Sequence, residues 1–182
     1  MSDTFRVVGT EQLLHSRVFD VERRTVRHGA ECFDRDVVTH GGAVSVLAVD
    51  DRERVGLISQ YRAPFDDFVL EIPAGTLDVV GEDPLDAAKR ELLEELGCRA
   101  ATWRALGRFM VSPGWCTQVM HVFEARGLAF EARQPAGPEE ASASIQWLAV
   151  DELRATLRAA GIADSTTVVA LHRVFGTFFD LD

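Results

Sequence analysis

The sequence predicts an α+β fold in which mixed sheets are covered by helices. Two observations lead to this prediction. Strand-like stretches, either apolar or alternating between apolar and polar residues, dominate the first two thirds of the chain, whereas helical patterns are few and come late. The chain has 182 residues, of which 47% are hydrophobic, so it can bury a sizeable core within one domain.

The predicted elements follow one another along the chain. Strands are expected at about 17–28, 31–38, 43–49, 54–61, 68–72, 101–112, 118–125 and 144–150. Helices are expected at about 84–96, 150–159 and 164–178, the last with an apolar stripe formed by Val168, Leu171, Val174, Phe175 and Phe178. The Pro- and Gly-containing stretch 133–138 is interpreted as a surface loop.

Composition excludes several classes of function. The net charge of −10 gives no electrostatic basis for binding nucleic acid or an anionic membrane, and an anionic substrate would need a cation as mediator. Three widely spaced cysteines indicate neither a disulfide framework nor a zinc site, and the longest apolar run, 43–49, is too short to span a bilayer. We therefore expect a cytoplasmic protein without membrane or nucleic-acid partners.

The helix at 84–96 has clearly marked ends. Asp83 suits the N-cap, Pro84 the first helical position, and Asp86 the positively polarised first turn. Gly97 fits the left-handed cap that ends many helices. Local residue chemistry and apolar periodicity therefore predict the same helix.

This helix concentrates three carboxylates in one turn. The apolar stripe is formed by Leu85, Ala88, Leu92 and Leu96. Glu91, Glu94 and Glu95 share another face, where their mutual repulsion is unfavourable and Arg90 is expected to offset only one of them. A divalent cation would relieve the remainder, and magnesium prefers such hard oxygen ligands. The alternative is an acidic helix face that is simply solvated.

The segment 75–98, GTLDVVGEDPLDAAKRELLEELGC, resembles the Nudix box, G-x5-E-x7-R-E-U-x-E-E-x-G-U, where U is a bulky apolar residue. The positions that match are Gly75, Glu82, Arg90, Glu91, Leu92, Glu94, Glu95, Gly97 and, weakly, Cys98. One extra residue separates Gly75 from Glu82, so that Gly81 stands where the strict pattern has its first glutamate; we interpret this as a loop variation. The resemblance implies a Nudix-type α/β/α sandwich with a mixed sheet over 41–182. Residues 1–40 would form an N-terminal extension of antiparallel strands.

The resemblance also implies the metal ligands. Glu91 and Glu95 would hold the metal, with Glu94 as a further candidate and the backbone carbonyl of Ala74 as another oxygen ligand. The cofactor would be Mg²⁺, with Mn²⁺ as an alternative. Glu95 is expected to face solvent and metal.

Two further motif positions would support this site. Glu82 would stabilise it, and Arg90 would hold Glu94. The implied reaction is attack of an activated water on one phosphorus of a diphosphate bridge, without a covalent intermediate.

Residues outside the box indicate the substrate class. Gln-Tyr-Arg at 60–62, Glu-Ile-Pro-Ala-Gly at 71–75 and Ser-Pro-Gly at 112–114 look like segments of ADP-ribose and nucleotide-sugar pyrophosphatases. The candidate substrate residues are Tyr61, Arg62, Glu71, Pro113 and Trp115. Arg62 could pair with a phosphate or lie on a base, and the two aromatic residues could stack on adenine. Equally, the arginine could be an ordinary surface residue and the aromatic residues part of a core.

The general base is harder to assign. Relatives carry a glutamate after the Ser-Pro-Gly turn, but the matching region here contains Gln118, which cannot accept a proton usefully. Glu139 and Glu140, in the loop before the strand at 144–150, are the remaining candidates, with Glu140 favoured. They could instead be two solvated loop acids.

The leading interpretation is therefore a magnesium-dependent hydrolase that converts ADP-ribose to AMP and ribose 5-phosphate. GDP-mannose, FAD, NADH or coenzyme A could replace that substrate, since the box handles only the diphosphate. A Nudix-fold sensor that binds a nucleotide without turnover is the alternative from another class. By resemblance we also expect a homodimer formed through the N-terminal strands.

Overall fold

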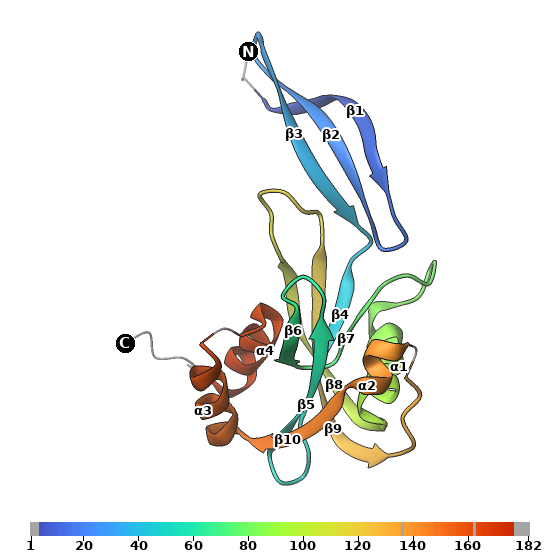
Figure 1. Cartoon of the computed structure of the whole chain (residues 1–182), viewed down its shortest axis with the longest axis vertical. Coiled ribbons are helices and arrows are strands. Elements are labelled where there is room, and N and C mark those ends of the chain that lie inside the picture. Colours follow the sequence, from blue (N-terminus) through green and yellow to red (C-terminus); the bar gives the residue numbers. More distant parts are fainter. Residues whose placement is uncertain (1–3, 136, 162, 177–182) are drawn as a thin grey trace. The chain divides into compact units, whose positions relative to one another are not determined.

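The computed structural model describes residues 4–135, 137–161 and 163–176, and the chain divides into two compact units. The N-terminal unit comprises 1–42 and 110–119, and the core unit comprises 43–109 and 120–182 (Figure 1). Within the described ranges, no helix is long and apolar enough to cross a membrane.

The N-terminal unit contains a three-stranded antiparallel sheet. Its strands are β1 (Arg6–His15), β2 (Phe19–His28) and β3 (Glu31–His40), in the order β1-β2-β3. β1 was not predicted, because two register shifts against β2 interrupt its apolar–polar alternation. Segment 110–119 joins the unit through β3, where the Val38 amide donates to the Trp115 carbonyl at 2.8 Å.

The core unit contains two sheets. A four-stranded sheet has the order β7-β4-β9-β8, and a three-stranded sheet the order β10-β5-β6. The strands are β4 (Ala43–Ala48), β5 (Arg54–Arg62), β6 (Asp67–Glu71), β7 (Ala74–Thr76), β8 (Cys98–Met110), β9 (Val119–Phe130) and β10 (Ser144–Ala149). β4 pairs parallel with β9 and antiparallel with β7, so the sheet is mixed, as the sequence predicts. β7 was missed because three residues are too few to show a pattern.

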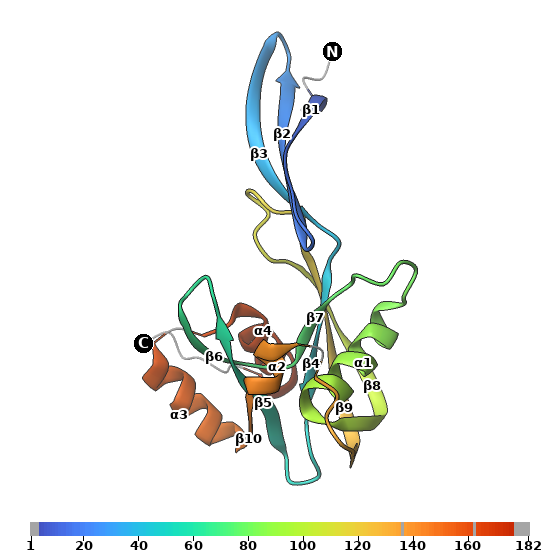
Figure 2. The same cartoon turned by 45° about the vertical axis from the view of Figure 1, so that its right-hand side comes forward.

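Helices cover the sheets on both sides. They are α1 (Pro84–Leu96), α2 (Pro138–Ser142), α3 (Val150–Ala160) and α4 (Ser165–Phe175). Both views place α1 on one side of the strands and α3 and α4 on the other (Figure 2). The predicted sandwich is therefore confirmed. The prediction of a loop through 133–138 is wrong at its end, because α2 begins at Pro138.

The central strand β4 is buried on both faces. Its residues Val44, Val46 and Ala48 belong to a core cluster with Ala87, Ala88, Leu92 and Leu96 of α1. Its residues Ala43 and Leu47 belong to a second cluster with Leu153 and Leu157 of α3 and Ala170 and Leu171 of α4. This double burial explains the continuous apolar run in the sequence, and it fixes α1 against the sheet.

Candidate active site

The ends of α1 are formed as its sequence predicts. The Asp83 side chain accepts a hydrogen bond from the Leu85 amide at 2.8 Å, and Pro84 is the first helical residue. Gly97 ends the helix in the left-handed conformation with φ of 64°. These caps set which residues face the sheet and therefore the direction of the carboxylates.

Two of the carboxylates are buried. The side chain of Glu95 is only 2% exposed, so the expectation that it faces solvent is wrong. Its Oε2 accepts a hydrogen bond from the Ala74 amide at 2.9 Å. Glu91 is 5% exposed and packs against Gly75, where a side-chain carbon would overlap its carboxylate. The glycine that opens the motif therefore leaves space for Glu91, a function that sequence reasoning missed although the fixed glycine was its signal.

Arg90 gathers the remaining acidic groups. It donates to both oxygens of Glu82 at 3.2 and 3.3 Å, to Glu91 at 2.6 Å and to Glu94 at 3.1 Å. Arg90 was expected to offset one carboxylate, whereas it forms hydrogen bonds with three and lies 3.9 Å from a fourth, Asp78. Burial alone would lower the pKa of Arg90, but the surrounding carboxylates outweigh it and hold that pKa well above its usual range.

The extra residue in the motif is accommodated in the loop between β7 and α1. Gly81 adopts a φ of 82°, which a side chain would disfavour. Glu82 nevertheless reaches Arg90, so the insertion does not disrupt this ion pair.

Glu91 and Glu95 are buried acids whose ionised forms are not fully compensated by nearby cations. Burial, together with the nearby charges of Glu94 and Glu140, raises the pKa of Glu91 to about 7 despite Arg90. Burial also raises the pKa of Glu95 to about 9, and Glu91 and Glu140 add to the effect. Buried carboxylates with raised pKa values mark a functional site more often than a structural one.

Glu140 is the candidate base that the structure brings to these carboxylates. It lies on α2, and its charge acts on both Glu91 and Glu95. Glu139 lies on the same short helix, but its side chain is outside the described part of the structure.

Arg62 and Glu71 form a bidentate ion pair with each other. The two hydrogen bonds measure 2.7 and 2.8 Å, and Glu71 is buried. The charges of Arg62 and Glu95 interact, which places this pair beside the carboxylate cluster. Tyr61 lies on the opposite face of the strand, because successive strand residues alternate, and its hydroxyl donates to Asp66 at 2.7 Å. Its proposed stacking on a base stays a prediction.

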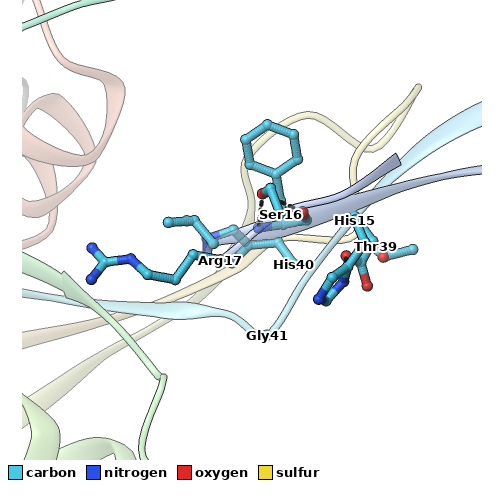
Figure 3. A pocket seen from close by; sticks show the side chains of 9 residues that line it. His15, Ser16, Arg17, Thr39, His40 and Gly41 are labelled. Carbon is cyan, nitrogen blue, oxygen red and sulfur yellow. Dashed lines mark hydrogen bonds and ion pairs between the residues drawn. The ribbon is translucent and has the colours of Figure 1, made fainter. Parts of the chain in front are cut away.

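The other candidate substrate residues belong to the N-terminal unit. Trp115 and Pro113 are exposed, and their contact with a substrate also stays a prediction. The same unit has a shallow pocket of about 330 Å³ at the turn between β1 and β2 (Figure 3). Its one carboxylate, Asp20, is bonded to His15 at 2.7 Å, so the pocket lining offers no set of oxygen ligands for a cation.

The donor chemistry of the core site fits a hard divalent cation. The candidate ligands are carboxylate oxygens and the backbone carbonyl of Ala74; Arg90 pairs with Glu82, Glu91 and Glu94, and the Ala74 amide holds the buried Glu95. In this structure the carboxylates accept hydrogen bonds from Arg90 and from the Ala74 amide. Among the described residues, no three acidic, histidine or cysteine side chains are close enough together to hold a metal ion.

The site thus consists of a helix that carries carboxylates, a glycine that leaves space for one of them, and an arginine that bonds to several. This arrangement agrees with the Nudix box that the sequence resembles. Residues 39–168 match the NUDIX domain, and the chain belongs to this family. It is 35% identical over 174 residues to the ADP-ribose pyrophosphatase of Mycobacterium tuberculosis, covering 93% of this chain and 84% of that protein. It is 32% identical to the methanol dehydrogenase activator of Bacillus methanolicus, covering 92% of this chain and 90% of that protein.

A solved ADP compounds hydrolase has the same fold, with a TM-score of 0.80 at 22% identity, covering 93% of this chain and 91% of the other. The chain is accordingly a pyrophosphohydrolase that acts on a nucleoside diphosphate linkage, and its resemblance to the ADP-ribose pyrophosphatase group is confirmed.

Proposed function

We propose that this enzyme hydrolyses ADP-ribose to AMP and ribose 5-phosphate with Mg²⁺, for which Mn²⁺ can substitute. The observation that carries this proposal is the buried, incompletely neutralised pair of Glu91 and Glu95 on α1, with Glu140 close to both. Similarity to an ADP-ribose pyrophosphatase supports the choice of substrate.

Each site residue would have a separate role in binding the cation or the substrate. Glu91, Glu95 and the Ala74 carbonyl would hold the cation, with Glu94 as a further ligand, and a bound cation would neutralise charge that develops on the diphosphate. Arg90 and Glu82 keep the carboxylates in place through their ion pairs. Arg62 could release Glu71 to contact a phosphate, since its guanidinium suits both partners.

Glu140 would act as the general base. It would take a proton from the attacking water while the water oxygen bonds to one phosphorus and the bridging P–O bond breaks. The negatively charged leaving phosphate departs without any covalent enzyme intermediate. Glu139 is the other candidate for this step.

Turnover of a small substrate panel tests the proposal. ADP-ribose, GDP-mannose, UDP-glucose, FAD, NADH and coenzyme A are incubated with and without Mg²⁺, and the products are separated by chromatography. We expect magnesium-dependent AMP and ribose 5-phosphate from ADP-ribose, and ¹⁸O-labelled water will mark the phosphorus attacked. Faster hydrolysis of another substrate would overturn the choice of ADP-ribose.

We also propose that residues 1–40 form a dimerisation element and that the protein works in the cytoplasm as a homodimer. In the N-terminal unit, large apolar side chains are exposed, among them Phe5, Val7, Leu14, Val18 and Phe19. The edge strand β1 is exposed over all ten residues, which leaves it open to pairing. Sedimentation should give twice the mass of one chain, and a monomeric mass at micromolar concentration would contradict this.

A further inference from the structure

Arg133 lies where two parts of the proposed site meet. After β9 ends at Phe130, the chain packs on the C-terminal cap of α1: the Glu131 amide donates to the Gly97 carbonyl at 2.7 Å. A side-chain carbon at Gly97 would come within 3.0 Å of Cγ of Arg133. The aliphatic stem of Arg133 therefore rests against the end of the helix that carries the candidate metal ligands.

The guanidinium of Arg133 holds the backbone of α2. It donates to the carbonyl of Glu140 at 2.9 Å and to the carbonyl of Ala143 at 3.3 Å. A cation is favourable at these last carbonyls of a helix. The Nε–H of Arg133 is buried and has no acceptor among the residues that the structure describes. Within that part of the chain, no carboxylate therefore accepts a hydrogen bond from Nε.

α2 is too short to be stable as an isolated helix. The helix spans five residues, and its N-cap Gly137 provides no side-chain hydrogen bond. Its backbone is closed by hydrogen bonds from the Ala141 amide to the Gly137 carbonyl and from the Ala143 amide to the Glu140 carbonyl. Arg133 thus adds a contact at the residue whose side chain is the candidate base.

We propose that Arg133 is a positioning residue that fixes the separation between Glu140 on α2 and the carboxylates of α1. This inference rests on the proposed function, in which Glu140 takes the proton. The aliphatic stem of Arg133 bears on α1 and its guanidinium bonds to the backbone of Glu140 itself, so a change at Arg133 moves the base without removing it.

Amide hydrogen exchange of the metal-free protein tests the anchoring directly. In Arg133→Met the amides of Ala141 and Ala143 should exchange about tenfold faster or more, since the variant keeps the stem and loses both bonds. Arg99→Met is the matched control, because Arg99 is exposed and pairs with Glu131 of the same connecting segment without touching α2. Unchanged exchange in Arg133→Met would overturn the anchoring.

A double-mutant cycle tests the connection to Glu140. Arg133→Met should lower kcat by about 10–100-fold, with the Mg²⁺ activation constant changed by less than about threefold. In a Glu140→Gln background, Arg133→Met should not lower kcat further, since the base is already absent. If the kcat losses of the two single variants multiply in the double variant, the inference is overturned, as it is if Glu140→Gln has full activity.

A second variant covers the case in which Arg133→Met fails to fold. Arg133→Lys keeps the cation and one of the two bonds, and we expect exchange of α2 and kcat between those of wild type and Arg133→Met. A kcat equal to wild type would count against the inference. The absence of turnover by wild type on every substrate would instead contradict the proposed function, and exchange alone would then decide whether Arg133 anchors α2.

Discussion

Two clusters of carboxylates and arginines in the core unit differ in charge balance. In one, Glu124 accepts hydrogen bonds from Arg104 at 2.6 Å and Arg126 at 2.7 Å, and Arg126 also binds Glu53. That cluster has two cations for two anions. In the candidate active site a single arginine, Arg90, pairs with Glu82, Glu91 and Glu94, while the buried Glu95 accepts a hydrogen bond from the Ala74 amide.

The difference in balance appears in the pKa values. Burial alone would raise the pKa of Glu124, but its two arginine partners outweigh burial and lower it. Burial raises the pKa of Glu91 despite Arg90, and it raises the pKa of Glu95 despite the Ala74 amide and the charge of Arg62. A folded chain can neutralise its buried acids, as it does at Glu124. The cluster of Glu82, Glu91, Glu94 and Glu95, called the anionic cluster below, has more acids than arginines, and a bound cation would favour the ionised form of its buried acids.

The largest effect is expected from neutralising one carboxylate of the anionic cluster. Glu95→Gln keeps an oxygen for the Ala74 amide but removes the charge, so kcat should fall by about a thousandfold or more. The metal-free variant should be at least as stable as wild type at neutral pH, because the raised pKa of Glu95 makes folding require proton uptake, and the glutamine amide removes this cost. Steady-state kinetics measures the fall in kcat, and thermal denaturation with and without Mg²⁺ measures stability. A retained stabilisation by Mg²⁺ would refute the ligand assignment.

The next effect concerns the space that the anionic cluster needs. Gly75→Ala places a methyl group where the Glu91 carboxylate lies, and moving that group by about 1 Å should lower kcat by about a hundredfold. Gly9→Ala is the control, because a side-chain carbon there meets only ordinary contacts with Thr25. Steady-state kinetics of the two variants should separate clearly; equal activities would show that Glu91 can shift without consequence.

A smaller loss is expected where an acidic residue acts only through Arg90. Glu82→Gln keeps the side-chain size and weakens the bidentate pair, leaving Arg90 with Glu91 and Glu94. A supporting residue of this kind should cost about tenfold in kcat. A thousandfold loss would instead indicate that Glu82 contacts the cation itself.

The balanced cluster should affect stability and leave turnover unchanged. Glu124→Gln leaves two arginines without their buried partner, which should cost about 2 kcal/mol, or roughly 4–8 °C in Tm. Because the pKa of Glu124 is lowered in the folded state, its contribution is complete above about pH 4.3 and is lost as the pH falls through the folded value. The difference in Tm between variant and wild type should therefore shrink on acidification, and a difference that grows would contradict this assignment.

Local chemistry predicted much of this molecule. Asp83, Pro84 and Gly97 marked the ends of α1, and the motif brought the acids onto one helix. The burial of Glu95 could not be predicted, because its partner, the Ala74 amide, comes from a strand distant in sequence. The opposite faces of Tyr61 and Arg62, by contrast, follow from strand alternation and could have been predicted.

The parallel pairing of β4 with β9 has a consequence for synthesis of the chain. This pairing sets Ala43 opposite Met120, and α1 lies in the sequence between these two residues. The sheet on which α1 packs can therefore form completely only after β9 has been translated. A growing chain forms its early strand pairs first and must then close this long loop at an entropic cost. A nascent chain that ends before β9 therefore carries the whole acidic motif and no assembled catalytic centre.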